Sequence, residues 1–439
     1  MIEFAKTEAL YKLFIECNQK IATDTRKIEN GSIFFALKGD NFDANTFALT
    51  AIEKGCSYAF VDDITLYNGI TIFVVEDVLA ALQNLARHHR KQLTIPIIGI
   101  TGSNGKTTNK ELIYAVLSKK YKTYATIGNL NNHIGVPLTL LQITTNHEIA
   151  IIEMGANHQG EIEMLCSICD PDLGLITNIG KAHLEGFKGI EGVKKGKSEL
   201  YKHIRNKNGK IFINGNDFVL SDLAGDIKKI YYGEDESFDV HGKLILNNEF
   251  VEFIWNTKGK SLDNRPLIKT NLFGHYNFIN VLCAACIGDY FKIDEDLINR
   301  ALSNYLPEMN RSQVKKTKSN TLILDAYNAN PSSMLLAIRH FTKQSFLNKY
   351  IVLGDMFELG EFSEKEHQLI LEELATYKDI KCMLIGTHFY EFRNKYLGFS
   401  FYKELDDAIV FFVKYPITET NLLIKGSRGI KLEKLVDYL

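Results

Sequence analysis

Two kinds of apolar pattern alternate along the 439 residues of this chain. Short continuous apolar runs predict buried strands, and segments with apolar residues three and four positions apart predict helices. Their alternation is typical of parallel sheets that are covered by helices on both faces. Before residue 215 the pattern predicts a helix at 78–90 and strands at 32–37, 58–61, 70–75, 149–153, 173–178 and 211–214.

A second alternating series begins after Pro307 and predicts strands at 321–325, 350–353, 382–385 and 422–424. Between the two series, residues 240–255 alternate apolar and polar positions around Asn247-Asn248, which predicts a hairpin that decorates the central sheet. We expect an α/β protein of three domains, because a chain of this length exceeds one hydrophobic core. The predicted domains are a small N-terminal α/β domain at 1–93, a central parallel-sheet domain at 94–307 and a C-terminal Rossmann-like domain at 308–439.

Charge and hydropathy narrow the classes of function. The chain has 51 basic and 53 acidic side chains, a balance that gives no overall field to attract nucleic acid or a membrane surface. No run approaches the ~18 apolar residues of a membrane span, and the first ten residues do not have the pattern of a signal peptide. We therefore expect a cytoplasmic protein that binds neither nucleic acid nor membranes.

The seven cysteines include two pairs with the spacing of metal ligands. Cys166 and Cys169 form one pair, and Cys283 and Cys286 form the other. Both pairs lie in helix-like apolar segments without the Gly or Pro turn of a zinc knuckle. We expect buried, reduced thiols, as in a reducing compartment.

One apolar run, at 95–100, breaks into a Gly-rich turn that ends in Gly105-Lys106-Thr107-Thr108. This order predicts a strand, a phosphate loop and the start of a helix, where backbone N–H groups, a Lys charge and a Thr hydroxyl bind phosphates and Mg²⁺. The spacing is unusual, because Ile100 occupies the position of the first Gly in the common phosphate loop. ATP binding is predicted, with an ordinary strand-to-helix turn as the alternative. The candidate contacts are Gly102, Ser103, Asn104, Gly105, Lys106, Thr107 and Thr108.

Polar side chains follow several other predicted strands, where ligands collect in open α/β sheets. Glu153 could hold the Mg²⁺ that bridges ATP phosphates, or it could be a carboxylate at a helix start. His183 could be a metal ligand or a phosphate donor, or an ordinary loop histidine. Asn277 and Asn280 offer the paired donor and acceptor of an adenine edge. The segment from Asp325 to Pro331 could contribute polar contacts, or it could be a turn rich in Asn and Pro.

Taken together, these segments resemble the Mur ligase family, the ATP-dependent amide-forming enzymes of bacterial cell-wall precursor synthesis. The resemblance covers nearly the whole chain. Its motifs are Thr23-Asp24-Thr25-Arg26, Phe34 to Gly39, Thr101 to Thr108, Gly128 to Asn132, Gly135 to Thr139, Glu153 to Ala156, His183-Leu184-Glu185, Asp325 to Pro331, Leu353 to Met356 with Glu358-Leu359-Gly360, and Lys425-Gly426-Ser427-Arg428.

Two motifs discriminate among the members of this family. Tyr327-Asn328-Ala329-Asn330-Pro331 looks like the member that adds a dipeptide, whereas the member that adds the third amino acid usually has Tyr-Ala-His-x-Pro. Gly354-Asp355-Met356 with Glu358-Leu359-Gly360 also resembles the dipeptide-adding member. The chain departs from the family at Tyr276, where His is usual, and at His133, where an acidic residue is common. Stacking by Tyr276 could substitute for His, and the role of His133 stays open.

The resemblance implies a ligase that joins D-alanyl-D-alanine to a UDP-N-acetylmuramoyl-tripeptide through an acyl phosphate, with ATP, two Mg²⁺ ions and a monomeric enzyme. It implies catalytic roles for Lys106, Glu153, His183 and Lys197, the last of these carbamylated, and metal ligation by Thr107, Glu153, His183 and Lys197. The resemblance also implies ATP contacts from Asn277, Asn280, Arg311 and Asp325. The expected substrate contacts are Thr25, Arg26, Lys38, Gly39 and Asp43 for UDP, Asn131 and Asn132 for the muramoyl peptide, and Asn328 and Asn330 for the dipeptide.

Two alternatives remain at this point. One is a ligase of the same family that adds a single amino acid in place of the dipeptide. The other is a nucleotide-dependent switch that uses the phosphate loop as a timer; such a protein would not need the N-terminal domain.

Overall fold

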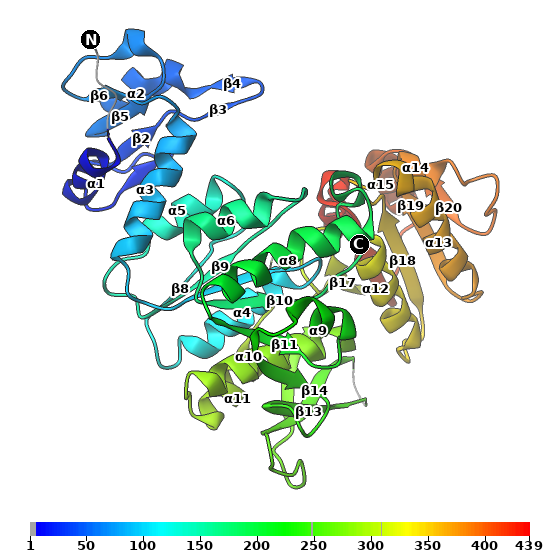
Figure 1. Ribbon diagram of the computed structural model, residues 1–439. Helices are drawn as coiled ribbons and strands as arrows, with labels where there is room; N and C mark the ends of the chain where they lie inside the picture. Colours follow the sequence, from blue (N-terminus) through cyan, green and yellow to red (C-terminus); the bar gives the residue numbers. More distant parts are fainter. Residues whose placement is uncertain (1–5, 247–248, 309) are drawn as a thin grey trace. The chain divides into compact units, whose positions relative to one another are not determined.

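A computed structural model describes residues 6–246, 249–308 and 310–439 of the chain. The fold is α/β, with a four-stranded, a nine-stranded and a six-stranded sheet and one two-stranded hairpin (Figure 1). The chain forms two compact units. The first unit contains the chain up to Ile100 together with Tyr121–Ala156 and Gly160–Gly174, and the second contains Thr101–Lys120, Asn157–Gln159 and Leu175–Leu439.

The four-stranded sheet lies near the N-terminus and has the order β1-β2-β5-β6, with each strand parallel to its neighbour. Its longest helix is α3 (Val78–Gln92), which begins where the Asp77 carboxylate accepts a hydrogen bond from the Ala80 N–H group. The other elements are α1 (Thr7–Glu16), β1 (Ile21–Ala22), β2 (Ile33–Phe35), β3 (Lys38–Gly39), β4 (Phe42–Asp43), η1 (Ala44–Phe47), α2 (Ala48–Glu53), β5 (Tyr58–Val61), η2 (Ile64–Leu66) and β6 (Ile72–Val74).

The nine-stranded central sheet has the order β15-β14-β13-β12-β11-β10-β7-β9-β8. Strands β7 (Ile97–Thr101), β8 (Thr123–Ala125) and β9 (Ile149–Glu153) run parallel, and so do β11 (Lys210–Asn214), β12 (Lys228–Gly233) and β13 (Val240–Ile245). At the far edge, β14 (Phe250–Thr257) and β15 (Ile268–Phe273) are antiparallel. Strand β10 (Leu173–Ile176) lies between β7 and β11.

Helices connect the strands of the central sheet. The helix that follows the phosphate loop, α4 (Lys106–Leu117), packs against α10 (Phe278–Tyr290), in which Phe278 and all residues from Val281 to Gly288 are buried. The remaining helices are α5 (Gly135–Leu141), α6 (Glu161–Cys169), α7 (Leu184–Phe187), α8 (Ile190–Asn206), α9 (Phe218–Ala224), η3 (His275–Asn277) and α11 (Glu295–Asn304).

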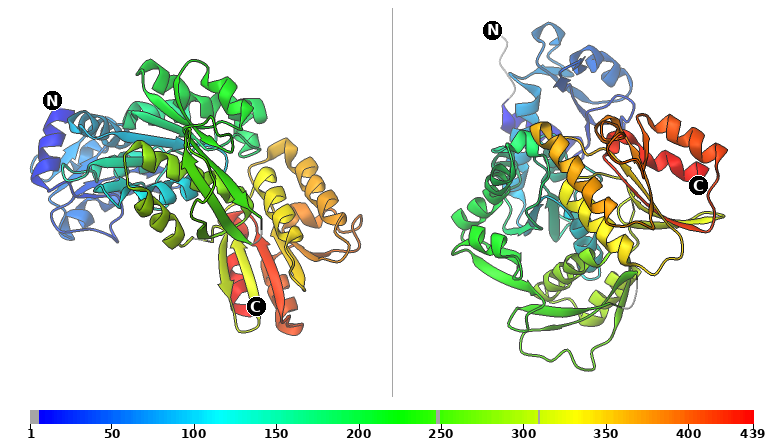
Figure 2. Two further views of the ribbon diagram at one scale, coloured as in Figure 1. Left: turned by 90° about the horizontal axis from the view of Figure 1, so that it is seen from below. Right: turned by 90° about the vertical axis from the view of Figure 1, so that its right-hand side faces the viewer.

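The six-stranded C-terminal sheet has the order β16-β17-β21-β18-β19-β20. All neighbouring strands are parallel except β16 and β17 at one edge. Helices α12 (Pro331–Lys343) and α13 (Ser363–Ala375) run beside each other (Figure 2). The other elements are β16 (Gln313–Lys316), β17 (Asn320–Asp325), β18 (Lys349–Gly354), η4 (Gly360–Phe362), β19 (Lys381–Ile385), α14 (Thr387–Tyr390), β20 (Ser400–Tyr402), α15 (Leu405–Lys414), β21 (Thr420–Lys425), η5 (Arg428–Ile430) and η6 (Leu432–Tyr438).

The predicted α/β architecture is confirmed, and two details of the central sheet differ from the prediction. The sheet is mixed rather than wholly parallel, because β13, β14 and β15 form an antiparallel edge. The predicted hairpin at 240–255 exists as β13 and β14, but these strands belong to the sheet instead of decorating it. Short connections allow antiparallel pairing at this edge, whereas parallel neighbours require longer crossovers. The predicted turn residues Asn247 and Asn248 lie outside the described residues.

The structure also shows the environment of the paired cysteines and the hydropathy of the helices. The four cysteines of the two spaced pairs are buried in α6 and α10, as expected for core thiols. Across residues 6–246, 249–308 and 310–439, no helix combines the length and hydropathy needed to cross a membrane.

Candidate active site

The phosphate loop connects β7 to α4 with two residues in left-handed or strained backbone regions. Gly102 has φ 143° and Gly105, just before the helix, has φ 76°. Lys106 begins the helix, and its Nζ atom donates to the carbonyl groups of Gly102 at 2.7 Å and Ser103 at 3.3 Å. The predicted contacts Thr107 and Thr108 lie in the first turn of α4, where backbone N–H groups favour an anion.

The residues that follow β10 brace this loop. The Thr177 hydroxyl donates to the Asn104 carbonyl at 2.6 Å, and the Asn178 amide both donates to that carbonyl and accepts from the Asn104 N–H group. A Cβ atom on Gly102 would lie 2.0 Å from Thr177 Oγ1, so only glycine fits at this position. Sequence reasoning did not single out Thr177, because the contact joins segments far apart in the chain.

A row of three asparagine side chains extends from the loop to α10. Asn109 Nδ2 donates to Asn280 Oδ1 at 2.8 Å, and Asn280 Nδ2 donates to Asn277 Oδ1 at 2.8 Å. The row ends where Asn277 Nδ2 donates to the Phe273 carbonyl. The structure thus places both predicted adenine contacts beside the loop and adds Asn109, which the sequence pattern did not single out. A Cβ atom on Gly105 would lie 3.2 Å from Asn280 Oδ1, so the asparagine row lies directly beside the phosphate loop.

His183 lies in a strained backbone position just before α7. Its φ of 53° is in the left-handed region, and so is the φ of 61° at Glu358. His183 Nδ1 contacts a carboxylate oxygen of Glu358, and this interaction lowers the pKa of the Glu358 carboxyl. Glu358 belongs to the motif after β18, so the structure brings two of the predicted motifs into contact.

Lys197 is completely buried in α8, with Nζ 5.0 Å from the centroid of the Phe187 ring. A Cβ atom on Gly196 would lie 2.4 Å from Phe187 Cε1, so this glycine makes room for the ring. Burial opposes the charged form of an amine, and a neutral amine is the form that adds CO₂. The surroundings of Lys197 therefore fit carbamylation.

Glu153 ends β9 and is 2% exposed. Its Oε1 atom accepts a hydrogen bond from Asn131 Nδ2 at 2.8 Å, and its backbone N–H donates to Thr126 Oγ1. A Cβ atom on Gly155 would lie 2.9 Å from Asn131 Oδ1. Asn132 instead accepts from the backbone N–H groups that begin α5. A buried carboxylate supplies the oxygen donors that Mg²⁺ prefers, so the chemistry of Glu153 fits the expected metal.

The predicted ATP contacts of the C-terminal sheet lie at the ends of neighbouring strands. Asp325 Oδ2 pairs with Lys425 Nζ at 2.5 Å, and Asp325 Oδ1 accepts from the Ser312 N–H group. The Arg311 guanidinium carbon lies 3.6 Å from the centroid of the Tyr327 ring.

The two asparagines predicted to bind the dipeptide have different environments. Asn328 is exposed, and its side-chain oxygen accepts from the Ala329 N–H group. Asn330 caps α12 reciprocally with Ser333, and its Nδ2 atom donates to Asn104 Oδ1 at 2.7 Å. Asn330 therefore contacts the phosphate loop directly, a contact that the sequence could not indicate.

All residues predicted to bind UDP belong to the first unit, and Lys38, Gly39 and Asp43 form its β3–β4 hairpin. Lys38 pairs with Asp62 at 2.7 Å and with Asp43 at 3.7 Å. Arg26 pairs with Asp24, which holds the pKa of the Asp24 carboxyl well below its usual range. The structure places Gly39 in β3, and the Thr25 carbonyl accepts from the side chain of Lys54.

Comparison with known proteins gives matches over most of the chain. Residues 100–288 match the family model of the Mur ligase middle domain, and residues 310–395 match that of the Mur ligase glutamate ligase domain. The chain is 33% identical to UDP-N-acetylmuramoyl-tripeptide--D-alanyl-D-alanine ligase of Bacillus subtilis, covering 95% of this chain and 92% of that protein. The enzyme of the same name from Escherichia coli is 32% identical, with coverage of 95% and 93%. A crystal structure of MurF from Acinetobacter baumannii superposes with a TM-score of 0.85 at 31% identity, covering 95% and 92%.

Proposed function

We propose, from the premise that the chain belongs to the Mur ligase family, that it joins D-alanyl-D-alanine to UDP-N-acetylmuramoyl-tripeptide with ATP. The observation that carries this proposal is similarity along 95% of the chain to relatives that bear the name of this activity. The products are the UDP-linked pentapeptide of peptidoglycan synthesis, ADP and phosphate.

The proposal divides the work among three domains. Residues 1–93 bind the UDP-linked substrate, residues 94–307 bind ATP, and residues 308–439 complete the ATP site and bind the dipeptide. The contact of Asn330 with Asn104 supports a site to which the C-terminal sheet contributes. The enzyme is a cytoplasmic monomer in this proposal.

The chemistry begins with a carboxylate, which is a poor electrophile. Transfer of the γ-phosphoryl group to the tripeptide carboxylate gives an acyl phosphate, and attack by the dipeptide amine expels phosphate and forms the amide. The task of the protein is positioning and charge neutralisation. Lys106 neutralises charge on the β- and γ-phosphates, and the N–H groups of the loop orient them.

Two magnesium ions would be held by residues whose chemistry suits them. Thr107 and Glu153 hold one ion, and His183 and carbamylated Lys197 hold the second. A carbamate replaces the positive charge of Lys197 with a carboxylate, as a cation site between anionic substrates requires. When bound, the ions reduce the repulsion between the transferring phosphoryl group and the attacking carboxylate.

The remaining predicted contacts are part of the same proposal. Asn277 and Asn280 bind the adenine, and Arg311 and Asp325 reach ATP from the C-terminal domain. Substrate contacts are made by Thr25, Arg26, Lys38, Gly39 and Asp43 for UDP, by Asn131 and Asn132 for the muramoyl peptide, and by Asn328 and Asn330 for the dipeptide.

A phosphate-release assay tests the function. Purified protein with ATP, Mg²⁺ and the UDP-linked tripeptide should release phosphate only after D-alanyl-D-alanine is added. Equal release with lysine or diaminopimelate on a UDP-linked dipeptide would favour the ligase that adds one amino acid. Slow release that needs no amine would favour the nucleotide switch.

A further inference from the structure

Two arginine side chains of the C-terminal sheet gather on one aromatic ring. The guanidinium carbon of Arg311 lies 3.6 Å from the centroid of the Tyr327 ring, and that of Arg428 lies 5.4 Å from the same centroid. Both distances are in the range of cation–π contacts. The ring of Tyr327 therefore positions two positive charges at one place.

Three adjacent strands bring these residues together. Arg311 precedes β16, Tyr327 follows β17, and Arg428 follows β21. Strand β17 pairs with β16 on one side and with β21 on the other, where Asp325 lies opposite Lys425. The cluster thus occupies the carboxyl ends of β17 and β21, the edge of an open α/β sheet where ligands collect.

The charges of the cluster are only partly neutralised. Lys425 is paired with Asp325 at 2.5 Å. Among the residues that the structure describes, neither Arg311 nor Arg428 forms a salt bridge, and the Arg311 Nε atom is buried without a hydrogen-bond partner. Arg428 is exposed, so its planar guanidinium is accessible to an anion from outside the chain.

An apolar ring lies beside this charge. Phe357 is 39% exposed, and a Cβ atom on Gly429 would lie 2.6 Å from Phe357 Cε2. The Phe357 N–H group donates to Ser427 Oγ at 2.9 Å, which ties the segment after β18 to the segment after β21. A guanidinium and an exposed aromatic ring thus flank Gly429.

We propose that Arg428 binds the terminal carboxylate of the dipeptide substrate and that Phe357 contacts its alanyl methyl groups. This inference rests on the proposed function and names residues that select its second substrate. A carboxylate matches the paired N–H donors of a guanidinium, and small apolar side chains match the ring. The phosphate loop already supplies donors for the triphosphate, whereas the dipeptide carboxylate still needs a cation.

A clamp on the terminal carboxylate distinguishes a dipeptide from a single amino acid by length. An extended dipeptide spans about 7 Å, so its amine lies about 3.5 Å farther from a carboxylate clamp than the amine of a single amino acid. A fixed carboxylate therefore presents the amine of a dipeptide at the acyl phosphate and holds that of a single amino acid short of it.

Steady-state kinetics with Arg428→Ala test the proposal. The KM for D-alanyl-D-alanine should rise by about 100-fold, because a charge-assisted pair is lost. The KM values for ATP and for the UDP-linked tripeptide should stay within about twofold. Arg428→Lys should recover part of the affinity, since it keeps the charge and loses the paired donors.

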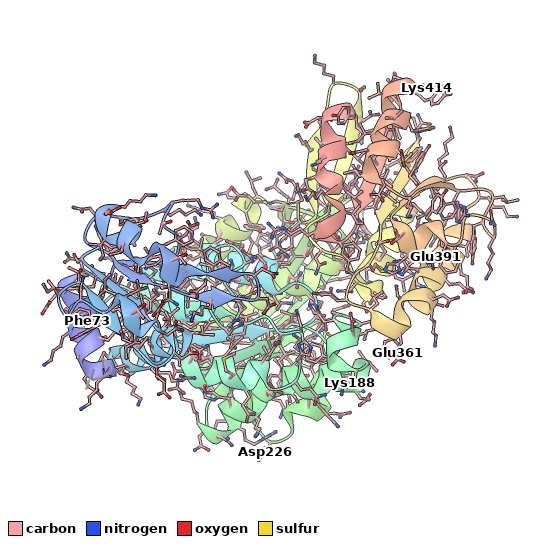
Figure 3. All side chains as sticks on the ribbon, turned by 90° about the horizontal axis from the view of Figure 1, so that it is seen from above. Phe73, Lys188, Asp226, Glu361, Glu391 and Lys414 are labelled. Carbon is pink, nitrogen blue, oxygen red and sulfur yellow. The ribbon has the colours of Figure 1, made fainter. Side chains whose placement is uncertain are left out.

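Arg393→Ala is the matched control. Arg393 also lies over a tyrosine ring, 4.5 Å from the centroid of Tyr390, but it follows α14, whereas the cluster follows β17 and β21. Glu391, two residues before it, is labelled in Figure 3 and is exposed. The control should leave all three KM values unchanged.

A substrate analogue separates this inference from the proposed function. The wild-type enzyme should use D-alanyl-D-alanine amide far less well than the free acid, and Arg428→Ala should use the two equally well. An unchanged dipeptide KM in Arg428→Ala, or wild-type activity that is equal with acid and amide, would overturn the inference while leaving the function intact. A wild-type enzyme that does not use the dipeptide at all would overturn the function itself.

Discussion

The amide nitrogen of Asn131 donates to Glu153 Oε1 at 2.8 Å and so ties an asparagine of the loop after β8 to the buried carboxylate at the end of β9. The same asparagine leaves no room for a side chain at Gly155. The sequence predicts that Asn131 contacts the muramoyl peptide, and the structure places it against Glu153, the expected magnesium ligand. A hydrogen bond of this kind fixes the orientation of a carboxylate before a metal binds.

Replacement of Asn131 by Ala should weaken magnesium binding by about 10- to 100-fold, because a partner that orients a metal ligand is lost. The measurement is direct Mn²⁺ binding by electron paramagnetic resonance, together with the Mg²⁺ concentration for half-maximal turnover. Asn146→Ala, at an exposed position of the same unit, serves as the control. Unchanged Mn²⁺ affinity in Asn131→Ala would remove the positioning role.

Replacement of Gly102 by Ala should abolish ATP binding and reduce turnover on the order of 100-fold or more, because displacement of the loop by about 1 Å is enough for that loss. The added Cβ would lie 2.0 Å from Thr177 Oγ1, and φ at this position is 143°. Fluorescent ATP-analogue binding measures the effect. Gly398→Ala is the control, since a Cβ there meets nothing within 4 Å. Normal nucleotide affinity in Gly102→Ala would show that the loop adapts.

The strands that were predicted correctly have strong local sequence patterns. The runs at 58–61 and 149–153 coincide with β5 and β9, because continuous apolar segments that end in a turn have few alternative structures. Weakly patterned elements were not predicted: β1 and β8 are short, and their pairing depends on neighbours far away in the chain. The hairpin at 240–255 was predicted, but its place in the central sheet and its pairing with β15 were not, because these depend on contacts outside the hairpin.

The residues of the candidate site show the same difference between local patterns and contacts made by the fold. The glycines and Lys106 of the phosphate loop have a local signature, so the sequence could indicate them. The partners that brace the loop, Thr177 and Asn109, have no signature of their own, and only the fold brings them to it. The contact between His183 and Glu358 joins two motifs that the resemblance identified separately.

A buried histidine predicts how stability depends on pH. Burial beside Phe273, followed by the effect of His275, lowers the pKa of His340 to about 4. The unfolded chain therefore takes up a proton near pH 6.5 while the folded chain does so only near pH 4, so stability is lost as pH falls through this window. The loss is at most about 1.4 kcal/mol per pH unit.

His340→Gln should flatten the decrease in the urea unfolding midpoint between pH 6.5 and pH 4, because glutamine keeps hydrogen-bonding groups and cannot titrate. Urea unfolding followed by circular dichroism at several pH values measures this midpoint. His133→Gln, at an exposed position, should keep the wild-type pH dependence. If His340→Gln and the wild type lose stability equally over this range, another group is responsible.

The environment of Lys197 leads to the last prediction. Lys197 is fully buried against the ring of Phe187, and burial favours the neutral amine, which is the form that adds CO₂. The carbamate predicts that Lys197→Ala loses turnover and that a small carboxylate such as acetate restores part of it. It also predicts that the wild-type enzyme loses activity when CO₂ is removed and shows a carbamate carbon signal by NMR after addition of ¹³C-bicarbonate. Lys195→Ala, an exposed position of the same helix, should behave as wild type in every assay. Because an unmodified lysine would give neither the carbon signal nor carboxylate rescue, the absence of both would rule out the carbamate.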